Sequence, residues 1–154
     1  HIGTGLSTIS NFSTFNLMPA LLQITVAPGN TNFVILDGVL YNTARTILYR
    51  YPPKRAGSSF TIPNTVNQLY AYAFGDCLDL TTITVPASVT SITWYVFDKY
   101  SKTAVFLGTN PAGVTIDGNA FGSTIEAGLV IQVPAGFLDA YRAAWPAFGA
   151  YMSE

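Results

Sequence analysis

The sequence predicts a mainly β fold, a solenoid of about four to five turns with roughly 22–26 residues in each turn. Three observations lead to this prediction. Apolar residues recur in phase between residues 60 and 134, an Asp-Gly pair separates two short apolar runs between residues 30 and 59, and the apolar spacing becomes helical after residue 134. Recurrence at a fixed period indicates stacked units, because one short unit cannot bury its apolar side chains alone.

Three sets of residues mark the repeat. The first has the form apolar-x-apolar-Pro, at residues 60–63 (FTIP), 83–86 (ITVP) and 131–134 (IQVP), with a fourth copy at 105–108 (VFLG) that has Gly in place of Pro. The second set is a small or β-branched residue followed by Phe74, Phe97 or Phe121. The third lies five residues before each of those phenylalanines, at Leu69, Ile92 and Ile116. A period of about 20–29 residues is typical of leucine-rich repeats.

We expect a single leucine-rich-repeat domain over residues 1–154, beginning with divergent or partial turns at 1–29. Residues 21–26 (LLQITV) repeat the pattern of residues 80–85 (LTTITV), and residues 6–9 (LSTI) resemble residues 89–92 (VTSI). The N-terminal segment therefore looks like the tail of one turn.

Residues 30–59 are expected to form an inserted β-hairpin or small meander. Asp37-Gly38 separates the apolar runs 34–36 and 39–41, and this pair suits the positive φ angles of a type I′ turn. A second turn at residues 42–44 leads into the run 46–51.

Regular repeats are expected at 60–130, followed by a C-terminal cap at 131–154. In residues 80–85 the alternation places Thr outward and Ile or Val inward, and Pro86 ends the strand because it has no N–H to donate. A helical face is formed in the cap by Phe137, Leu138, Tyr141, Ala144 and Trp145, and Pro146 marks its end.

The composition excludes several classes of protein. Only 10% of the 154 residues are charged and the net charge is −1, which argues against non-specific nucleic-acid binding. No apolar run approaches the 18 or so residues of a membrane-spanning helix, so we expect no membrane insertion. The single cysteine, Cys77, permits no internal disulfide and is expected to be a small buried hydrophobe.

The sequence predicts no catalytic site, no cofactor and no metal. The only histidine is His1, at the chain end, so a nucleophile activated by histidine is not expected. Asp76 and Asp98 each lie one or two residues after a repeated phenylalanine and are expected to stack at a corner, but two spaced acids make a weak calcium site.

Two groups of residues are candidates for partner binding. The aromatic group is Tyr70, Tyr72, Trp94, Tyr95 and Tyr100, among which Tyr72 and Tyr95 are expected to stack in adjacent turns. These rings either pack on one another to cover the solenoid or form an exposed patch of the kind favoured in interfaces. The basic group is Arg45, Arg50, Lys54 and Arg55. These cations either lie along an ordinary solvated hairpin edge or bind an anionic partner.

Residues 60–97 resemble the BspA-like leucine-rich repeat, through FTIP and ITVP, VTSI, Ala73-Phe74, Cys77 and LTTI. The hairpin around Asp37-Gly38 and the segment from Val133 to Trp145 also resemble parts common in that family. The resemblance implies a surface-exposed or secreted protein of host-associated anaerobic bacteria or some parasitic protozoa. It implies adhesion to a protein or glycan on a host or bacterial surface. The alternative that stays open is a structural spacer or assembly segment of a longer surface protein.

Overall fold

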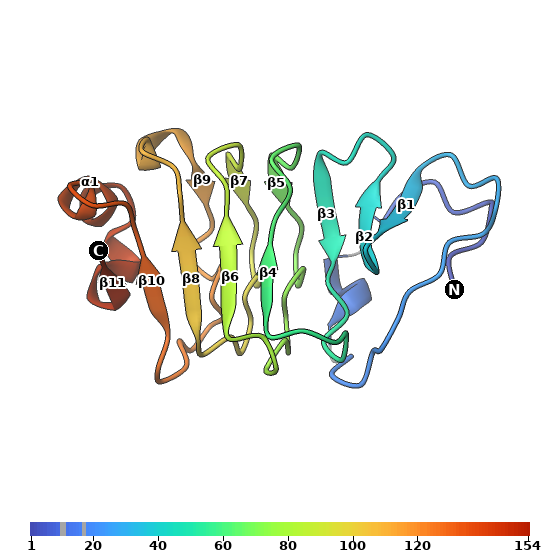
Figure 1. Cartoon of the computed structure of the whole chain (residues 1–154), viewed down its shortest axis with the longest axis horizontal. Coiled ribbons are helices and arrows are strands. Elements are labelled where there is room, and N and C mark those ends of the chain that lie inside the picture. The colour runs from blue at the N-terminus through green and yellow to red at the C-terminus, as the bar shows by residue number, and fades with distance from the viewer. Residues whose placement is uncertain (10–11, 17) are drawn as a thin grey trace.

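A computed structural model describes residues 1–9, 12–16 and 18–154, and it consists mainly of strands arranged in two sheets (Figure 1). The front sheet contains β4 (Ser59–Thr61), β6 (Thr82–Val85), β8 (Thr103–Phe106), β10 (Val130–Gln132) and β11 (Met152–Ser153). All of its strand pairs are parallel. Within the described part of the chain, no helix is long and apolar enough to span a lipid bilayer.

The back sheet begins with antiparallel strands and continues with parallel ones. Its strands are β1 (Phe33–Leu36), β2 (Val39–Asn42), β3 (Ile47–Arg50), β5 (Gln68–Leu69), β7 (Ser91–Ile92) and β9 (Thr115–Ile116). The predicted hairpin is β1–β2, with Asp37 and Gly38 at φ angles of 49° and 77° in its turn. Since β3 pairs antiparallel with β2 and parallel with β5, the meander is continuous with the sheet formed by the repeats.

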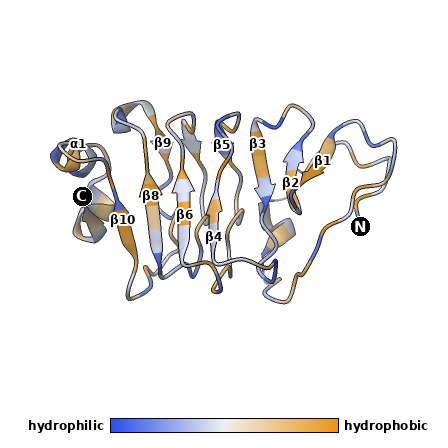
Figure 2. Ribbon diagram, viewed as in Figure 1, coloured by the Kyte–Doolittle hydropathy of each residue, from blue (hydrophilic) through white to orange (hydrophobic). Residues whose placement is uncertain are grey.

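Between residues 59 and 116 the chain passes alternately through the two sheets. The strands β4, β6 and β8 of the front sheet are each followed by a strand of the back sheet, β5, β7 and β9. The third set of repeat residues, Leu69, Ile92 and Ile116, occupies one register in the back sheet. Apolar stretches recur along the strands of both sheets (Figure 2). The buried side chains of these strands belong to one core cluster.

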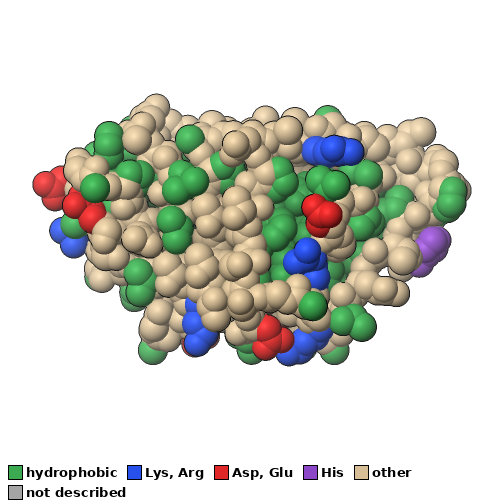
Figure 3. Space-filling model, viewed as in Figure 1, with side chains coloured by type: hydrophobic (Ala, Val, Ile, Leu, Met, Phe, Trp, Pro, Cys, Tyr) green, Lys and Arg blue, Asp and Glu red, His purple; other side chains and the backbone are tan. Residues whose placement is uncertain are grey.

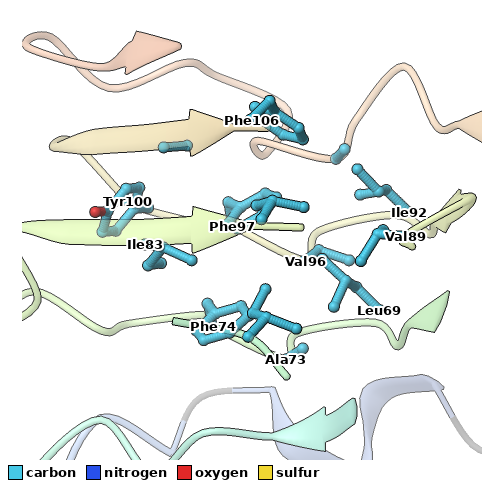
Figure 4. Packing of buried hydrophobic residues seen from close by; sticks show 14 of the residues in the cluster. Leu69, Ala73, Phe74, Ile83, Val89, Ile92, Val96, Phe97, Tyr100 and Phe106 are labelled. Atoms are coloured by element: carbon cyan, nitrogen blue, oxygen red, sulfur yellow. The ribbon is translucent and has the colours of Figure 1, made fainter. Parts of the chain in front are cut away.

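The phenylalanines of the second set form a row of stacked rings in the core, of which Figure 4 shows Phe74 and Phe97. The rings of Phe74 and Phe97 are parallel within 8°, with centroids 5.7 Å apart, and the rings of Phe97 and Phe121 are 4.8 Å apart at 17°. Tyr51 extends the row before Phe74, and Phe148 of the cap extends it after Phe121. One phenylalanine per turn therefore connects successive turns through direct ring contact.

The prediction was wrong in one register. It placed Val105 in the inward slot of the fourth copy, whereas Ala104 and Phe106 are buried and Val105 faces outward. The spacing between paired strands is also less regular than expected, since Thr103 pairs with Thr82 on one side and with Val130 on the other. The interval from Thr82 to Thr103 is slightly shorter than the expected 22–26 residues, and the interval from Thr103 to Val130 is slightly longer. Because side chains alternate along a strand, a one-residue error exchanges the two faces.

The N-terminal segment does not repeat the strand expected at residues 21–26. It contains the 3-10 helix η1 (Phe12–Phe15) and one parallel bridge, between Ile2 and Val26. Ile9 and Phe15 instead pack with Tyr70 in a second apolar cluster on the outer side of the back sheet. Residues 10, 11 and 17 of the predicted turns lie outside the described residues.

The C-terminal cap contains the expected helix and one strand more than expected. Helix α1 (Leu138–Ala144) ends before Pro146, and the 3-10 helix η3 (Pro146–Tyr151) leads into β11. Another 3-10 helix, η2 (Pro111–Gly113), lies against α1, and Trp145 Nε1 donates a hydrogen bond to Pro111 O at 3.2 Å. The Glu154 carboxylate accepts hydrogen bonds from the N–H groups of Gly136 and Leu138, which ties the chain end to the start of α1.

Cys77 is fully buried, as expected from its slot in the repeat. Burial raises the pKa of its thiol to about 12, although the nearby Arg50 charge opposes the shift. Because the thiolate is the reactive form, we expect iodoacetamide to label native Cys77 two to three orders of magnitude more slowly than the thiol of the unfolded chain. Mass spectrometry with and without denaturant measures both rates, and comparable rates would contradict a buried thiol.

Candidate binding surface

The aromatic residues Tyr72, Trp94 and Tyr95 form a compact cluster at the corner after the back-sheet strands. Tyr72 and Tyr95 stack with centroids 5.4 Å apart and planes 20° apart, which confirms their predicted stacking. Trp94 meets both rings edge to face, at 5.7 Å from Tyr72 and 5.1 Å from Tyr95. Three rings that contact one another in this way hold a fixed orientation.

The backbone at this corner is unusual for large residues. Tyr72 and Tyr95 have φ angles of 59° and 57°, and Asp76 and Lys99 each have a φ angle of 58°. A bulky residue in the left-handed region is strained by about 1–3 kcal/mol and persists only where surrounding contacts hold it. Since both turns repeat the same geometry, the corner belongs to the repeat itself and stacks Tyr72 on Tyr95 in register.

Three of the five predicted aromatic residues do not lie at the surface. Tyr72 is only 7% exposed and packs against Trp94 and Tyr95, which are half-buried. Tyr70 is 8% exposed, and its hydroxyl donates a hydrogen bond to Ile9 O, so the N-terminal segment covers it. Tyr100 is fully buried, contacts Phe97 and donates its hydroxyl to Thr103 O at 2.9 Å. Tyr100 belongs to the core, because the corner turns it inward after Phe97.

The basic group is not one patch. Arg45 and Lys54 are exposed, and Lys54 is paired with Asp79 at 2.8 Å. Arg55 donates to Asp37 O at 2.7 Å and lies over the rings of Tyr51 and Phe60, 5.2 and 5.8 Å from their centroids. The face of the front sheet carries few charged side chains over its middle (Figure 3).

Arg50 is fully buried, which the sequence did not indicate. Tyr51 N donates to Ala73 O in the same way that Phe74 N donates to Val96 O in the next turn, so Tyr51 and Phe74 are equivalent positions. Arg50, the residue before Tyr51, therefore occupies the position that Ala73 and Val96 occupy in later turns. Its Nη1 donates to Tyr72 O, while Nε and Nη2 are buried without a protein partner. Burial lowers the pKa of the guanidinium, and nearby Cys77 and Asp76 oppose this shift.

A groove of about 330 Å³ lies beside the aromatic cluster, on the back sheet at β7 and β9. Its lining residues are Ser91, Ile92, Thr93, Trp94, Thr115, Ile116 and Asp117. Ser91 pairs with Thr115 across the two strands, while Ile92 and Ile116 turn toward the core. The groove thus has hydroxyl-bearing side chains along the sheet, an indole on one wall and one carboxylate.

Sequence reasoning singled out Trp94 but not the hydroxyl residues of this groove. A signal was present, because the position before Leu69, Ile92 and Ile116 is Gln68, Ser91 and Thr115, a polar column on the outer face of the sheet. Asp117 Oδ1 accepts the N–H of Asn119 at 2.8 Å, which orients its carboxylate.

The acidic residues Asp76 and Asp98 occupy adjacent corners, as expected, with Asp76 N donating to Asp98 O at 3.1 Å. Asp76 pairs with Lys99 at 2.9 Å. No cluster of three or more metal-ligating His, Cys, Asp or Glu side chains is found across residues 1–9, 12–16 and 18–154.

We expect the variant Asp98→Asn to be more stable than the parent near neutral pH. Burial raises the pKa of the Asp98 carboxyl, Lys99 opposes this, and Asp76 and Glu126 reinforce it. The folded state therefore holds this proton more tightly than the unfolded state, whose aspartate pKa is about 3.9. The resulting stabilisation is fully present below about pH 3.9 and is lost as the pH rises through the folded pKa.

Thermal unfolding followed by circular dichroism measures this effect. The midpoint of Asp98→Asn is expected to exceed that of the parent at about pH 7 and to approach it at about pH 3. Asp139→Asn, at an exposed acid in the first turn of α1, is the matched control; it removes a favourable charge at the helix N-terminus and should not raise the midpoint at neutral pH. A lower midpoint for Asp98→Asn at neutral pH would show that the Asp98 carboxylate stabilises the corner.

Comparison with known proteins agrees with this architecture. A search of curated proteins finds no match to the chain. A solved leucine-rich repeat protein from Eubacterium ventriosum is 29% identical with a TM-score of 0.60, over 85% of this chain and 31% of that protein. A solved leucine-rich cell surface protein from Faecalibacterium prausnitzii is 24% identical with a TM-score of 0.54, over 72% of this chain and 36% of that protein.

The chain therefore spans about a third of the length of these two solved proteins. The family described as BspA type leucine-rich repeat region matches residues 54–131 in six copies, just over half of the chain. The matched residues include every complete turn described above and the stacked phenylalanines Phe74, Phe97 and Phe121. With its repeat period, its two sheets and this match in agreement, the chain belongs to the BspA-type leucine-rich repeat family.

Proposed function

We propose that this chain is a non-enzymatic binding module of a cell-surface or secreted adhesion protein. In this proposal the two sheets are the faces of an open-ended solenoid, and the outer side of the back sheet recognises a host matrix protein, a glycan or a partner cell surface. The family to which the chain belongs supports a binding or structural role.

The observation that carries the proposal is the groove at β7 and β9 beside the Tyr72–Trp94–Tyr95 cluster. Aromatic residues with fixed orientation lose little conformational entropy when a partner binds, which is why they are enriched at interfaces. The groove lies on the repeated part of the chain, where β7 is held between β5 and β9, and β9 is the edge strand of the back sheet.

Binding of the purified chain to an array of matrix proteins, mucins and host glycans tests this proposal. Thr115→Lys places a charge in the groove at an exposed position, so it should weaken binding at least about tenfold without unfolding the protein. The matched control is Arg45→Ala/Lys54→Ala, which removes two exposed cations elsewhere. Binding that is lost only in this control would assign recognition to an anionic partner and contradict the groove.

A structural spacer in a longer surface protein is the second candidate. It is favoured by the continuous row of ring contacts from Tyr51 to Phe148, because each turn packs directly on the next from one end of the repeat to the other. Absence of binding at micromolar concentration to every array component, by a protein shown to be folded, would favour the spacer.

A further inference from the structure

We propose that the groove at β7 and β9 binds an uncharged saccharide. The inference rests on the proposed function and names the class of ligand for that same site. Four features of the groove carry it: its size, its hydroxyl-bearing strands, its single indole wall and its charge.

The groove has the size of a small-molecule site. Its volume of about 330 Å³ lies at the lower end of the range of about 300–1,000 Å³ found for ligand pockets. A protein partner needs about 800 Å² of surface on each side, centred on large apolar anchors. The large hydrophobic residues that are exposed in the described part of the chain lie outside the groove: Leu6, Met18, Leu22, Leu78, Leu107 and Val130.

The polar side chains of the groove form a short grid. Ser91 and Thr115 are directly opposite each other on adjacent parallel strands, which places their backbones about 4.8 Å apart. Thr93 follows Ser91 by two residues, directly after the end of β7, and its hydroxyl donates to Leu69 O at 3.0 Å. A hydroxyl can both donate and accept, so a grid of this kind is complementary to the alternating hydroxyl groups of a sugar ring.

The aromatic wall supplies the second kind of contact that a sugar ring needs. One face of a pyranose consists largely of C–H groups and is apolar, whereas its rim carries the hydroxyls. Trp94 lines the groove, and its edge-to-face contacts with Tyr72 and Tyr95 fix its orientation. A rigid indole next to hydroxyl donors and acceptors matches both parts of such a ligand.

The charge of the groove selects among saccharides. Asp117 is the only charged residue among those lining it, and its carboxylate is oriented by the N–H of Asn119. A carboxylate accepts hydrogen bonds from sugar hydroxyls and repels sialic, uronic and sulfated sugars. The cations Arg45, Lys54 and Arg55 do not line the groove and cannot offset this repulsion there.

Tryptophan fluorescence gives a direct measurement, because the chain has two tryptophans and Trp145 is only 2% exposed. The probes are glucose, galactose, mannose, N-acetylglucosamine and N-acetylgalactosamine, with glucuronate and sialic acid as charged counterparts. At least one neutral sugar is expected to change the fluorescence saturably, with a Kd at or below about 1 mM. Trp94→Phe should abolish the change while Trp145 still reports a folded cap.

Two conservative variants localise the binding. Thr115→Val removes one hydroxyl at nearly constant volume and is expected to weaken the neutral sugar about two- to tenfold. For Asp117→Asn, the ratio of the Kd for glucuronate to the Kd for glucose is expected to fall about fivefold. Thr84→Val, at an outward position of β6 on the front sheet, is the matched control and should change neither value.

Each outcome has a defined meaning. Absence of a fluorescence change with every neutral sugar, or a change that persists unaltered in Thr115→Val and Asp117→Asn, would overturn the saccharide site. If a matrix protein binds on the array and loses binding in Thr115→Lys while no sugar binds, the binding function stands and only the ligand class is wrong. If no component of the array binds and no sugar binds, both proposals fail.

Discussion

Replacing Phe97 by alanine is expected to lower the free energy of unfolding by about 3–5 kcal/mol. Phe97 is fully buried and is the middle ring of the stacked row, between Phe74 and Phe121. The substitution removes the side chain's buried apolar surface, leaves a cavity and breaks the ring contacts with Phe74, Phe121 and Tyr100. Because the row connects successive turns, the loss affects the packing of three turns.

Urea unfolding followed by circular dichroism and by tryptophan fluorescence measures this loss. Phe97→Leu keeps most of the volume and is expected to cost less than the alanine variant. Leu78→Ala, at a side chain that is 55% exposed, is the matched surface control and should stay within about 0.5 kcal/mol of the parent. A loss below about 1.5 kcal/mol for Phe97→Ala would mean that the neighbouring turns close the cavity.

The variant Arg50→Met is expected to raise the free energy of unfolding by about 1–3 kcal/mol. The Arg50 guanidinium is fully buried, and its Nε and Nη2 atoms lack a protein partner. Methionine is apolar and flexible enough to fill the same space, so it removes the desolvation cost of the charge. The substitution removes the hydrogen bond from Arg50 Nη1 to Tyr72 O, but this carbonyl still accepts a hydrogen bond from Gly75 N at 3.1 Å.

Arg50→Ala separates charge from volume in this experiment. It removes the same charge but leaves a cavity, so it is expected to be less stable than Arg50→Met. Thermal and urea unfolding of both variants provide the comparison, and Arg45→Met is the matched control at an exposed arginine. A loss of more than about 1 kcal/mol for Arg50→Met would show that the buried guanidinium is a net stabilising group, as it is when water satisfies its remaining donors.

Much of the fold could be predicted because repeated apolar residues have one role in every turn. Leu69, Ile92 and Ile116 share a register in the back sheet, and Phe74, Phe97 and Phe121 stack in the core. The hairpin at Asp37-Gly38 was equally predictable, since this pair adopts the positive φ angles that the turn requires. These features depend on local conformation and on a period that is visible in the chain.

The register of β8 could not be predicted in the same way. Val105 and Phe106 are both apolar and adjacent, so either of two neighbouring registers places a suitable side chain inside. Only the pairing of Thr84 with Val105 and of Val85 with Phe106 decides between these alternatives. The strand expected at residues 21–26 did not form for a related reason. Its pattern matches β6, but the segment forms an isolated bridge from Val26 to Ile2 and accepts a hydrogen bond from Lys54 N at Leu21 O.

The candidate site was predicted in part. Trp94 and Tyr95 lie where the repeat places them, at the corner beside the groove. Tyr70 is covered by a contact with Ile9, 61 residues away in the chain, and such a contact leaves no trace in the local pattern. The sequence places Arg50 with the other cations of the hairpin edge, whereas the structure buries it fully, which is rare for arginine.

The sequence by itself therefore determined the repeat, its stacked phenylalanines, the hairpin and the family, because each follows from periodicity or from the conformational preference of one turn. Only the tertiary structure decided which side chains are accessible. Burial depends on neighbours that are distant in sequence: Ile9 over Tyr70, the corner of the next turn around Arg50, and β7 beside β9 at the groove. A binding surface is made of exposed groups, so it could be located only after the turns had been stacked.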